Sequence, residues 1–155
     1  MKIFKPFALA MLMSLGLAVG VAWADARPSN SPRQNKDVVK AAALVDQGKF
    51  AEAIPLLKRV VVAEPKNADA YNYLGYSHRK LGAKDVALGY YQKALDLKPQ
   101  HLGANEYLGE LYLELGDIKS AEERLDVLDW ACLLGCEEYT DLKNAIEAYK
   151  AKRGS

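Results

Sequence analysis

The sequence predicts an all-α fold made of three helical hairpins and a C-terminal capping helix. The first observation is an internal repeat of 34 residues, and the second is the helical spacing of apolar residues within each repeat. Repeats of this length are typical of solenoids, in which each unit covers the apolar face of its neighbour. The positions that share the spacing are Gly48, Gly82 and Gly116; Ala53, Ala87 and Ala121; Leu57, Tyr91 and Leu125; and Pro65 and Pro99.

The middle unit, residues 68–99, shows how one hairpin is encoded. Gly82 is expected to end its first helix, because glycine adopts a left-handed conformation without a side-chain clash. A second amphipathic helix follows, and Pro99 prevents it from continuing. Gly75 and Ala87 are small where the two helices should cross, so we expect the helices to approach closely there.

The segment after the third unit, residues 137–155, is expected to form a capping helix. Its apolar residues share one helical face, and most other positions are charged or polar. Stacked repeats need a terminal unit with such a polar outer face. Trp130, just before this segment, is expected to be a core aromatic packed against the cap. The apolar face consists of Tyr139, Leu142, Ile146 and Tyr149.

These patterns together resemble the tetratricopeptide repeat family. The matching residues are Tyr71, Leu74, Gly75, Gly82, Ala87, Tyr91, Ala94 and Pro99 in the middle unit; Leu108, Gly109, Tyr112, Gly116, Ala121 and Leu125 in the third; and Ala41, Leu44, Gly48, Ala53, Leu57 and Pro65 in the first. His78 departs from the pattern, because the family usually has an aromatic residue there. The resemblance implies a right-handed superhelix of three repeats over residues 36–136, capped by residues 137–155.

The resemblance also implies a function, which is that of a non-enzymatic scaffold binding a protein or peptide in a concave groove. The family's inward-pointing positions, carried over to this sequence, make the groove apolar, then aromatic and basic, then acidic. Tyr76 and Arg79 are expected to dominate, because tyrosine and arginine are enriched at interface hot spots. The basic-and-asparagine clamp that some members use for acidic chain termini is not reproduced. The predicted partner-binding residues are Asn72, Tyr76, Arg79, Lys80, Glu106, Glu110 and Leu113.

The first 24 residues have the layout of a secretory signal peptide. Two lysines precede an apolar stretch over residues 6–21, and the small-residue sequence AWA follows. We expect cleavage after Ala24, a flexible leader over residues 25–35, and a periplasmic protein with partners in the cell envelope. An uncleaved membrane anchor is the alternative, although the apolar stretch is short for a bilayer core of about 30 Å.

The two cysteines, Cys132 and Cys136, bracket the place where the third unit lacks the proline of the others. Two cysteines in an oxidising compartment usually pair, and a helix that ends at Gly135 and turns can bring them together. We therefore expect a structural disulfide. A redox-active pair and a soft-metal site, as in a copper- or thiol-handling protein, are the alternatives. His78 and His101 are expected to lie too far away to complete a metal site.

The rest of the sequence indicates neither catalysis nor nucleic-acid binding. The formal net charge is +1, from 21 basic and 20 acidic residues, with no basic stripe. There is no phosphate-binding loop, nucleophile elbow or metal-binding histidine pair. Carboxylates fall at the spacing of solvated helix surfaces, with an acid–base role as the alternative. We expect no enzymatic activity, cofactor or metal, and no membrane association after signal cleavage; self-association through the first repeat is a further alternative.

Overall fold

The computed structural model describes residues 35–154, which form seven α-helices. The predicted signal peptide, and the predicted leader apart from Asn35, lie outside the described residues. The helices are α1 (Lys36–Asp46), α2 (Phe50–Ala63), α3 (Ala68–Lys80), α4 (Lys84–Leu97), α5 (Leu102–Leu115), α6 (Ile118–Ala131) and α7 (Glu137–Gly154).

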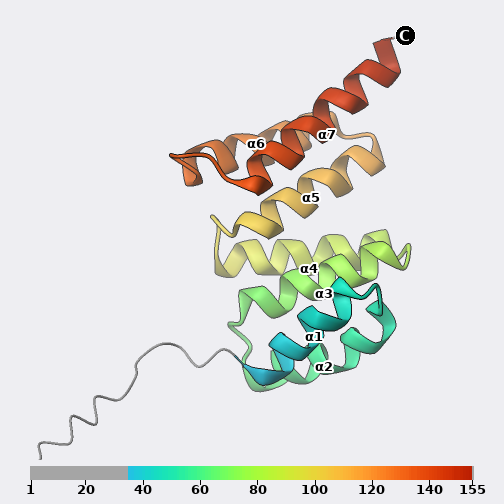
Figure 1. Ribbon diagram of the computed structural model, residues 1–155, viewed down its shortest axis with the longest axis vertical. Helices are drawn as coiled ribbons and strands as arrows, with labels where there is room; N and C mark the ends of the chain where they lie inside the picture. The colour runs from blue at the N-terminus through green and yellow to red at the C-terminus, as the bar shows by residue number, and fades with distance from the viewer. Residues whose placement is uncertain (1–34, 155) are drawn as a thin grey trace, which may run out of the picture. The chain divides into compact units, whose positions relative to one another are not determined.

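The helices pair as hairpins α1–α2, α3–α4 and α5–α6, which stack in chain order (Figure 1). Each hairpin packs against the next through contacts of α2 with α3 and of α4 with α5. Helix α7 packs on both α5 and α6 and covers the apolar surface that they expose. The predicted all-α fold of three hairpins and a capping helix is confirmed.

Glycine ends the first helix of each hairpin, as predicted from the repeat. Gly48, Gly82 and Gly116 have φ values of +71°, +81° and +86°, in the left-handed region that side chains rarely adopt. Polar side chains cap the starts of the same helices by accepting hydrogen bonds from backbone N–H groups. These capping residues are Asn35, Asn67 and His101.

The close approach of α3 and α4 is confirmed. A Cβ atom built on Gly75 would lie 2.6 Å from Cδ1 of Tyr91, which is too short for any real contact. Tyr91 and Ala87 are both fully buried. The same arrangement recurs between α5 and α7, where a Cβ on Gly109 would lie 2.5 Å from Cδ2 of Leu142. Glycine at these positions therefore sets how closely the helices pack.

The two cysteines form a disulfide in the turn between α6 and α7, as predicted. Their Cα atoms are 5.6 Å apart, within the usual range for a disulfide. Helix α6 ends at Ala131, earlier than the expected end at Gly135, so that both cysteines lie in the turn. Gly135 adopts a φ of +85° there. In this form neither sulfur is a free thiolate that could bind copper.

Trp130 is not the core aromatic that the sequence predicted, because its side chain is 78% exposed. Leu128, two residues earlier, is fully buried, and residues two apart on a helix point to different faces. The interior face of α6 is therefore filled by Leu128, and Trp130 lies on the outer surface. Leu133 and Leu134 in the disulfide turn are also exposed.

No helix within residues 35–154 combines the length and apolar character that a membrane span requires.

Candidate functional site

The candidate site is the face formed by the first helix of each hairpin. Helix α1 contacts α3, α3 contacts α5, and α5 contacts α7, so these four helices form one continuous layer. Helices α2, α4 and α6 form the other layer (Figure 1). All seven predicted partner-binding residues lie on α3 and α5.

Aromatic rings gather at the middle of this face. The ring centroids of Tyr76 and Tyr107 are 4.6 Å apart, and the ring of Phe50 meets Tyr76 edge-on at 6.0 Å. The ammonium group of Lys80 lies 4.9 Å from the Tyr76 ring centroid, within range of a cation–π interaction. The rings border a pocket of about 210 Å³ lined by Val45, Asp46, Tyr73, Tyr76 and Tyr107. The predicted binding residues Tyr76 and Lys80 are thus brought together beside a hollow.

Arg79 does not extend freely into the groove as the sequence suggested. Its Nη1 atom lies 2.5 Å from Oε2 of Glu110, and its Nη2 atom lies 2.7 Å from Oε1 of Glu114. Lys84 adds a third contact, with its Nζ atom 3.0 Å from Oε2 of Glu114. The Arg79 side chain is only 8% exposed. Arg79 therefore joins α3 to α5, and its guanidinium is already satisfied by charge-assisted hydrogen bonds.

Two other predicted binding residues are buried. Leu113 is 8% exposed and packs in the apolar cluster beneath α7, so the capping helix removes it from the groove surface. Asn72 on α3 is 5% exposed, and its Oδ1 atom has no hydrogen-bond partner among residues 35–154. Its Nδ2 atom lies beside Gly103, in the first turn of α5. Asn72 thus lines the contact between α3 and α5 with one acceptor unused.

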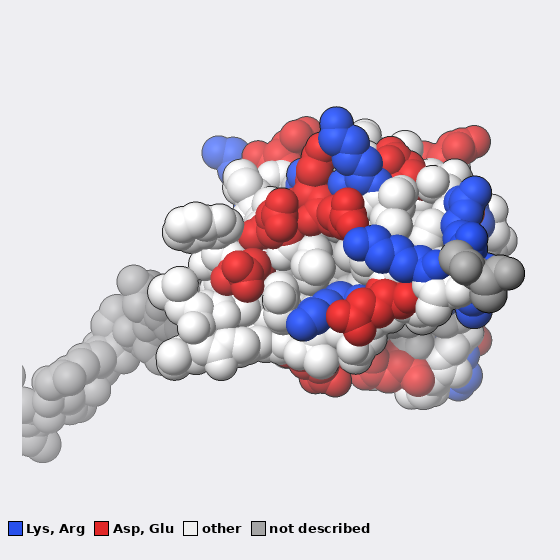
Figure 2. Space-filling model, turned by 90° about the horizontal axis from the view of Figure 1, so that it is seen from above, with Lys and Arg blue, Asp and Glu red and all other residues white. Residues whose placement is uncertain are grey.

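Glu106 carries the least expected feature of the site. Glu106 is 8% exposed, and within the described chain its side chain forms neither a hydrogen bond nor an ion pair. Figure 2, which views the protein from the end where α6 and α7 lie, shows acidic side chains in a contiguous group. The carboxylates whose charges act on Glu106 are Glu110 and, from α7, Asp141, Glu138 and Glu137.

Burial raises the pKa of Glu106 to about 8, and the neighbouring carboxylates push the pKa in the same direction. Burial also raises the pKa of Tyr107, and the negative charge of an ionised Glu106 would raise it further. The site therefore holds a carboxyl group that a nearby positive charge would convert to its ionised form.

We expect Glu106 to make the fold less stable as the pH rises from about 4.5 to about 8. An unfolded glutamate loses its proton near the lower value, whereas the folded state keeps the proton up to the higher one. Glu106→Gln, which is neutral at every pH, should match the parent in acid and be more stable by roughly 1–3 kcal/mol above pH 8. Urea unfolding of both proteins across this range measures the difference. A difference that does not change with pH would contradict the assignment.

Sequence reasoning missed the contribution of α7 to this face, together with Tyr73 and Tyr107. A signal was present, because Tyr139 and Leu142 stand 34 residues after Asn105 and Leu108. Helix α7 accordingly occupies the place of the first helix of a further hairpin, packed on α5. Its acidic first turn therefore lies near Glu106.

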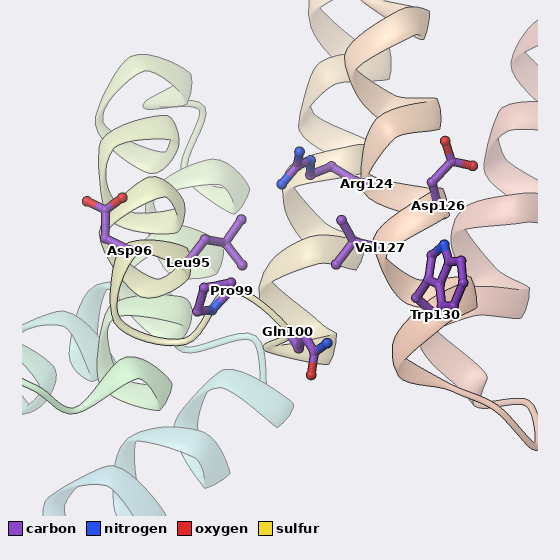
Figure 3. A pocket seen from close by; sticks show the side chains of 8 residues that line it. All are labelled: Leu95, Asp96, Pro99, Gln100, Arg124, Asp126, Val127 and Trp130. Carbon is purple, nitrogen blue, oxygen red and sulfur yellow. The ribbon is translucent and has the colours of Figure 1, made fainter.

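A second hollow, of about 470 Å³, lies between the end of α4 and helix α6. Figure 3 shows Leu95 and Pro99 on one side of it and Val127 and Trp130 on the other. The Nη1 atom of Arg124 donates a hydrogen bond of 3.4 Å to Oδ1 of Asn105 on α5.

Over residues 35–154, no three histidine, cysteine, aspartate or glutamate side chains come together as a metal site would require.

The geometry defines an α-solenoid of stacked helical hairpins, with a small hollow beside aromatic rings on the face of the first helices. Two family models, each described as a tetratricopeptide repeat, match residues 38–101 and 80–129, and together they cover more than half of the sequence. The chain belongs to the tetratricopeptide repeat family.

Individual relatives agree with this assignment. A probable biofilm formation methyltransferase, WspC, from Pseudomonas aeruginosa is 33% identical over 94 residues, which are 61% of this chain and 22% of that protein. The chain spans a third or less of the length of the curated relatives it matches. Among solved structures, the translocator chaperone SycD of Yersinia enterocolitica matches with a TM-score of 0.68 at 19% identity, over 77% of this chain and 92% of that one. SycD in complex with a peptide of the translocator YopD matches with a TM-score of 0.64 at 19% identity, over 76% of this chain and 92% of that one.

Proposed function

We propose that this chain is a non-enzymatic scaffold that binds a segment of a partner protein in the groove of α1, α3, α5 and α7. The observation that carries the proposal is the cluster of partly exposed rings around Tyr76 and Tyr107. This cluster borders a hollow on the layer formed by α1, α3, α5 and α7. A few residues carry most of the binding energy of protein interfaces, and tyrosine is enriched among them. The similarity of fold to SycD, whose structure holds a peptide of its partner, supports the same reading.

We also propose that the protein acts in the periplasm, with partners in the cell envelope. The support is the sequence alone, in which a lysine-bearing start, an apolar stretch and AWA precede the repeats. The disulfide between Cys132 and Cys136 is compatible with an oxidising compartment.

Site-specific photo-crosslinking in cells tests both proposals. A photoreactive amino acid in place of Lys80, which is exposed beside Tyr76, should yield crosslinks to other polypeptides in the periplasmic fraction. The same residue in place of Trp130, exposed on the outer surface, serves as the matched control. Tyr76→Ala should abolish the Lys80 crosslinks, and the recovered chain should begin at Asp25. Crosslinks from the outer position alone would refute groove binding, and a chain retaining Met1 would refute export by a cleaved signal.

A further inference from the structure

The two halves of the groove differ in how their polar groups are satisfied. Near the ends of α3 and α5, Glu110 and Glu114 are neutralised by Arg79 and Lys84. Near the starts of the same helices, buried acceptors have no such partner. The half near the helix starts, which we name the acidic half, contains Asn72, Glu106, Glu137, Glu138 and Asp141.

Glu106 and Asn72 lie in the same stretch of the groove. Asn72 is beside Gly103, and Glu106 follows Gly103 by about one turn of α5. Both side chains are more than nine-tenths buried, and both leave acceptor capacity unused within residues 35–154. Buried polar groups of native proteins nearly always have partners, so the unused acceptor of Asn72 indicates that a donor is missing. The unpaired carboxyl of Glu106, which keeps slight contact with solvent, adds a second acceptor to the same stretch.

The structural role of the acidic residues does not account for Glu106. Glu137 and Glu138 occupy the first turn of α7, where acidic side chains stabilise a helix through its dipole. Glu106 is instead in the second turn of α5, which begins at Leu102. A buried carboxyl among other carboxylates destabilises the fold, so its presence needs a reason other than folding.

We propose that the acidic half of the groove binds a lysine or arginine side chain of the partner segment, with its charged group received by Glu106 and by Oδ1 of Asn72. This inference rests on the proposed function of the groove. The apolar stem of the same side chain would lie against the rings of Tyr76 and Tyr107, which the structure places at the adjoining hollow.

The chemistry of the pocket matches such a ligand. Lysine and arginine side chains carry only donors, which is what two unused acceptors require. In the part of the chain that is described, no ion pair compensates the charges of Glu137, Glu138 and Asp141. A cation bound there would also ionise Glu106. Aromatic faces also attract cations. An acidic or wholly apolar segment would leave both the buried acceptors and the charge unsatisfied.

A library of random dodecapeptides selected on the immobilised full-length chain provides the probe. We expect selected peptides to carry lysine or arginine at one fixed position. Replacing that residue by the uncharged norleucine should weaken binding about ten- to a hundredfold, the loss of a charge-assisted hydrogen bond. Glu106→Gln should weaken binding of the parent peptide similarly and should leave the norleucine peptide unaffected. Glu123→Gln, the same change at an exposed position of α6, is the control and should change neither.

The outcomes separate this inference from the function on which it rests. Peptides that require Tyr76 but show no preference for a basic residue, or whose basic residue is indifferent to Glu106→Gln, would overturn the inference and leave groove binding intact. Peptides that bind a Tyr76→Ala variant equally well, or a selection that enriches nothing, would overturn both. Circular dichroism of Glu106→Gln and Tyr76→Ala should show unchanged helix content.

Discussion

Replacing Gly75 with alanine is expected to lower the free energy of unfolding by roughly 1–3 kcal/mol, although alanine is the better helix former. The added methyl group would lie 2.6–3.0 Å from three ring atoms of Tyr91. That ring is fully buried between the helices of its hairpin, so it cannot rotate aside without disturbing its neighbours. The helices α3 and α4 must therefore separate, which opens space elsewhere in the core. Thermal and urea unfolding followed by circular dichroism measure the loss.

Gly89→Ala is the matched control, because Gly89 lies in the middle of α4 with no atom within 4 Å of a built Cβ. There the higher helix propensity of alanine acts alone and should raise stability by about 0.5–1 kcal/mol. The same chemical change should thus have opposite signs at two positions of one hairpin. If both variants gained stability, the contact between Gly75 and Tyr91 would not limit the packing of α3 and α4.

The repeat pattern predicted these packing features because they depend on residues within one unit. Gly75, Ala87 and Tyr91 stand at repeat positions that hold residues of similar kind in the other units, and their local spacing decides where two adjacent helices can touch. The ends of the helices at Gly48, Gly82 and Gly116 were likewise predictable, because glycine adopts the left-handed conformation that ends a helix. The pairing of Cys132 with Cys136 was expected from the predicted export to an oxidising compartment and from a turn at Gly135.

The features that the sequence did not reveal depend on how separate units meet. Arg79 and Glu110 are 31 residues apart, and the sequence predicted both as partner-binding residues without pairing them with each other. Their pairing appears only when α5 is placed beside α3. The face of α6 that carries Trp130 could not be chosen correctly without knowing that α7 covers Leu128. The acidic half of the groove is hidden for the same reason, because α5 and α7 contribute to it jointly.

These inter-unit contacts also decide which charges remain for a partner. Arg79 and Lys84 satisfy Glu110 and Glu114, whereas Glu106 one turn earlier has no cation near enough to pair within residues 35–154. The groove is therefore not uniformly acidic along α5. It has one half closed by internal ion pairs and one half with unused acceptors, and this asymmetry would give a segment bound as proposed a defined orientation.

Arg79→Ala is expected to lower the free energy of unfolding by about 2–4 kcal/mol. Removing one member of a buried ion pair leaves the partner charges uncompensated. Arg79 is 8% exposed and binds two carboxylates, which are themselves 27% and 35% exposed. Because the glutamates keep some contact with water, the loss should fall below that of a fully buried pair. Urea unfolding near neutral pH measures it.

Arg59→Ala provides the matched control, since Arg59 also pairs with a carboxylate, Asp37, across two helices. That pair is exposed, at 61% and 41%, and surface pairs contribute between 0 and about 1 kcal/mol. The two arginine variants should therefore differ several-fold in their effect on unfolding. The pKa of Glu114 lies below its ordinary value. In acid, where Glu114 takes up a proton, the loss caused by Arg79→Ala should shrink, because that carboxyl no longer carries an uncompensated charge. Equal effects of the two substitutions, or a loss that persists in acid, would mean that Arg79 does not stabilise the contact between α3 and α5 through its charge.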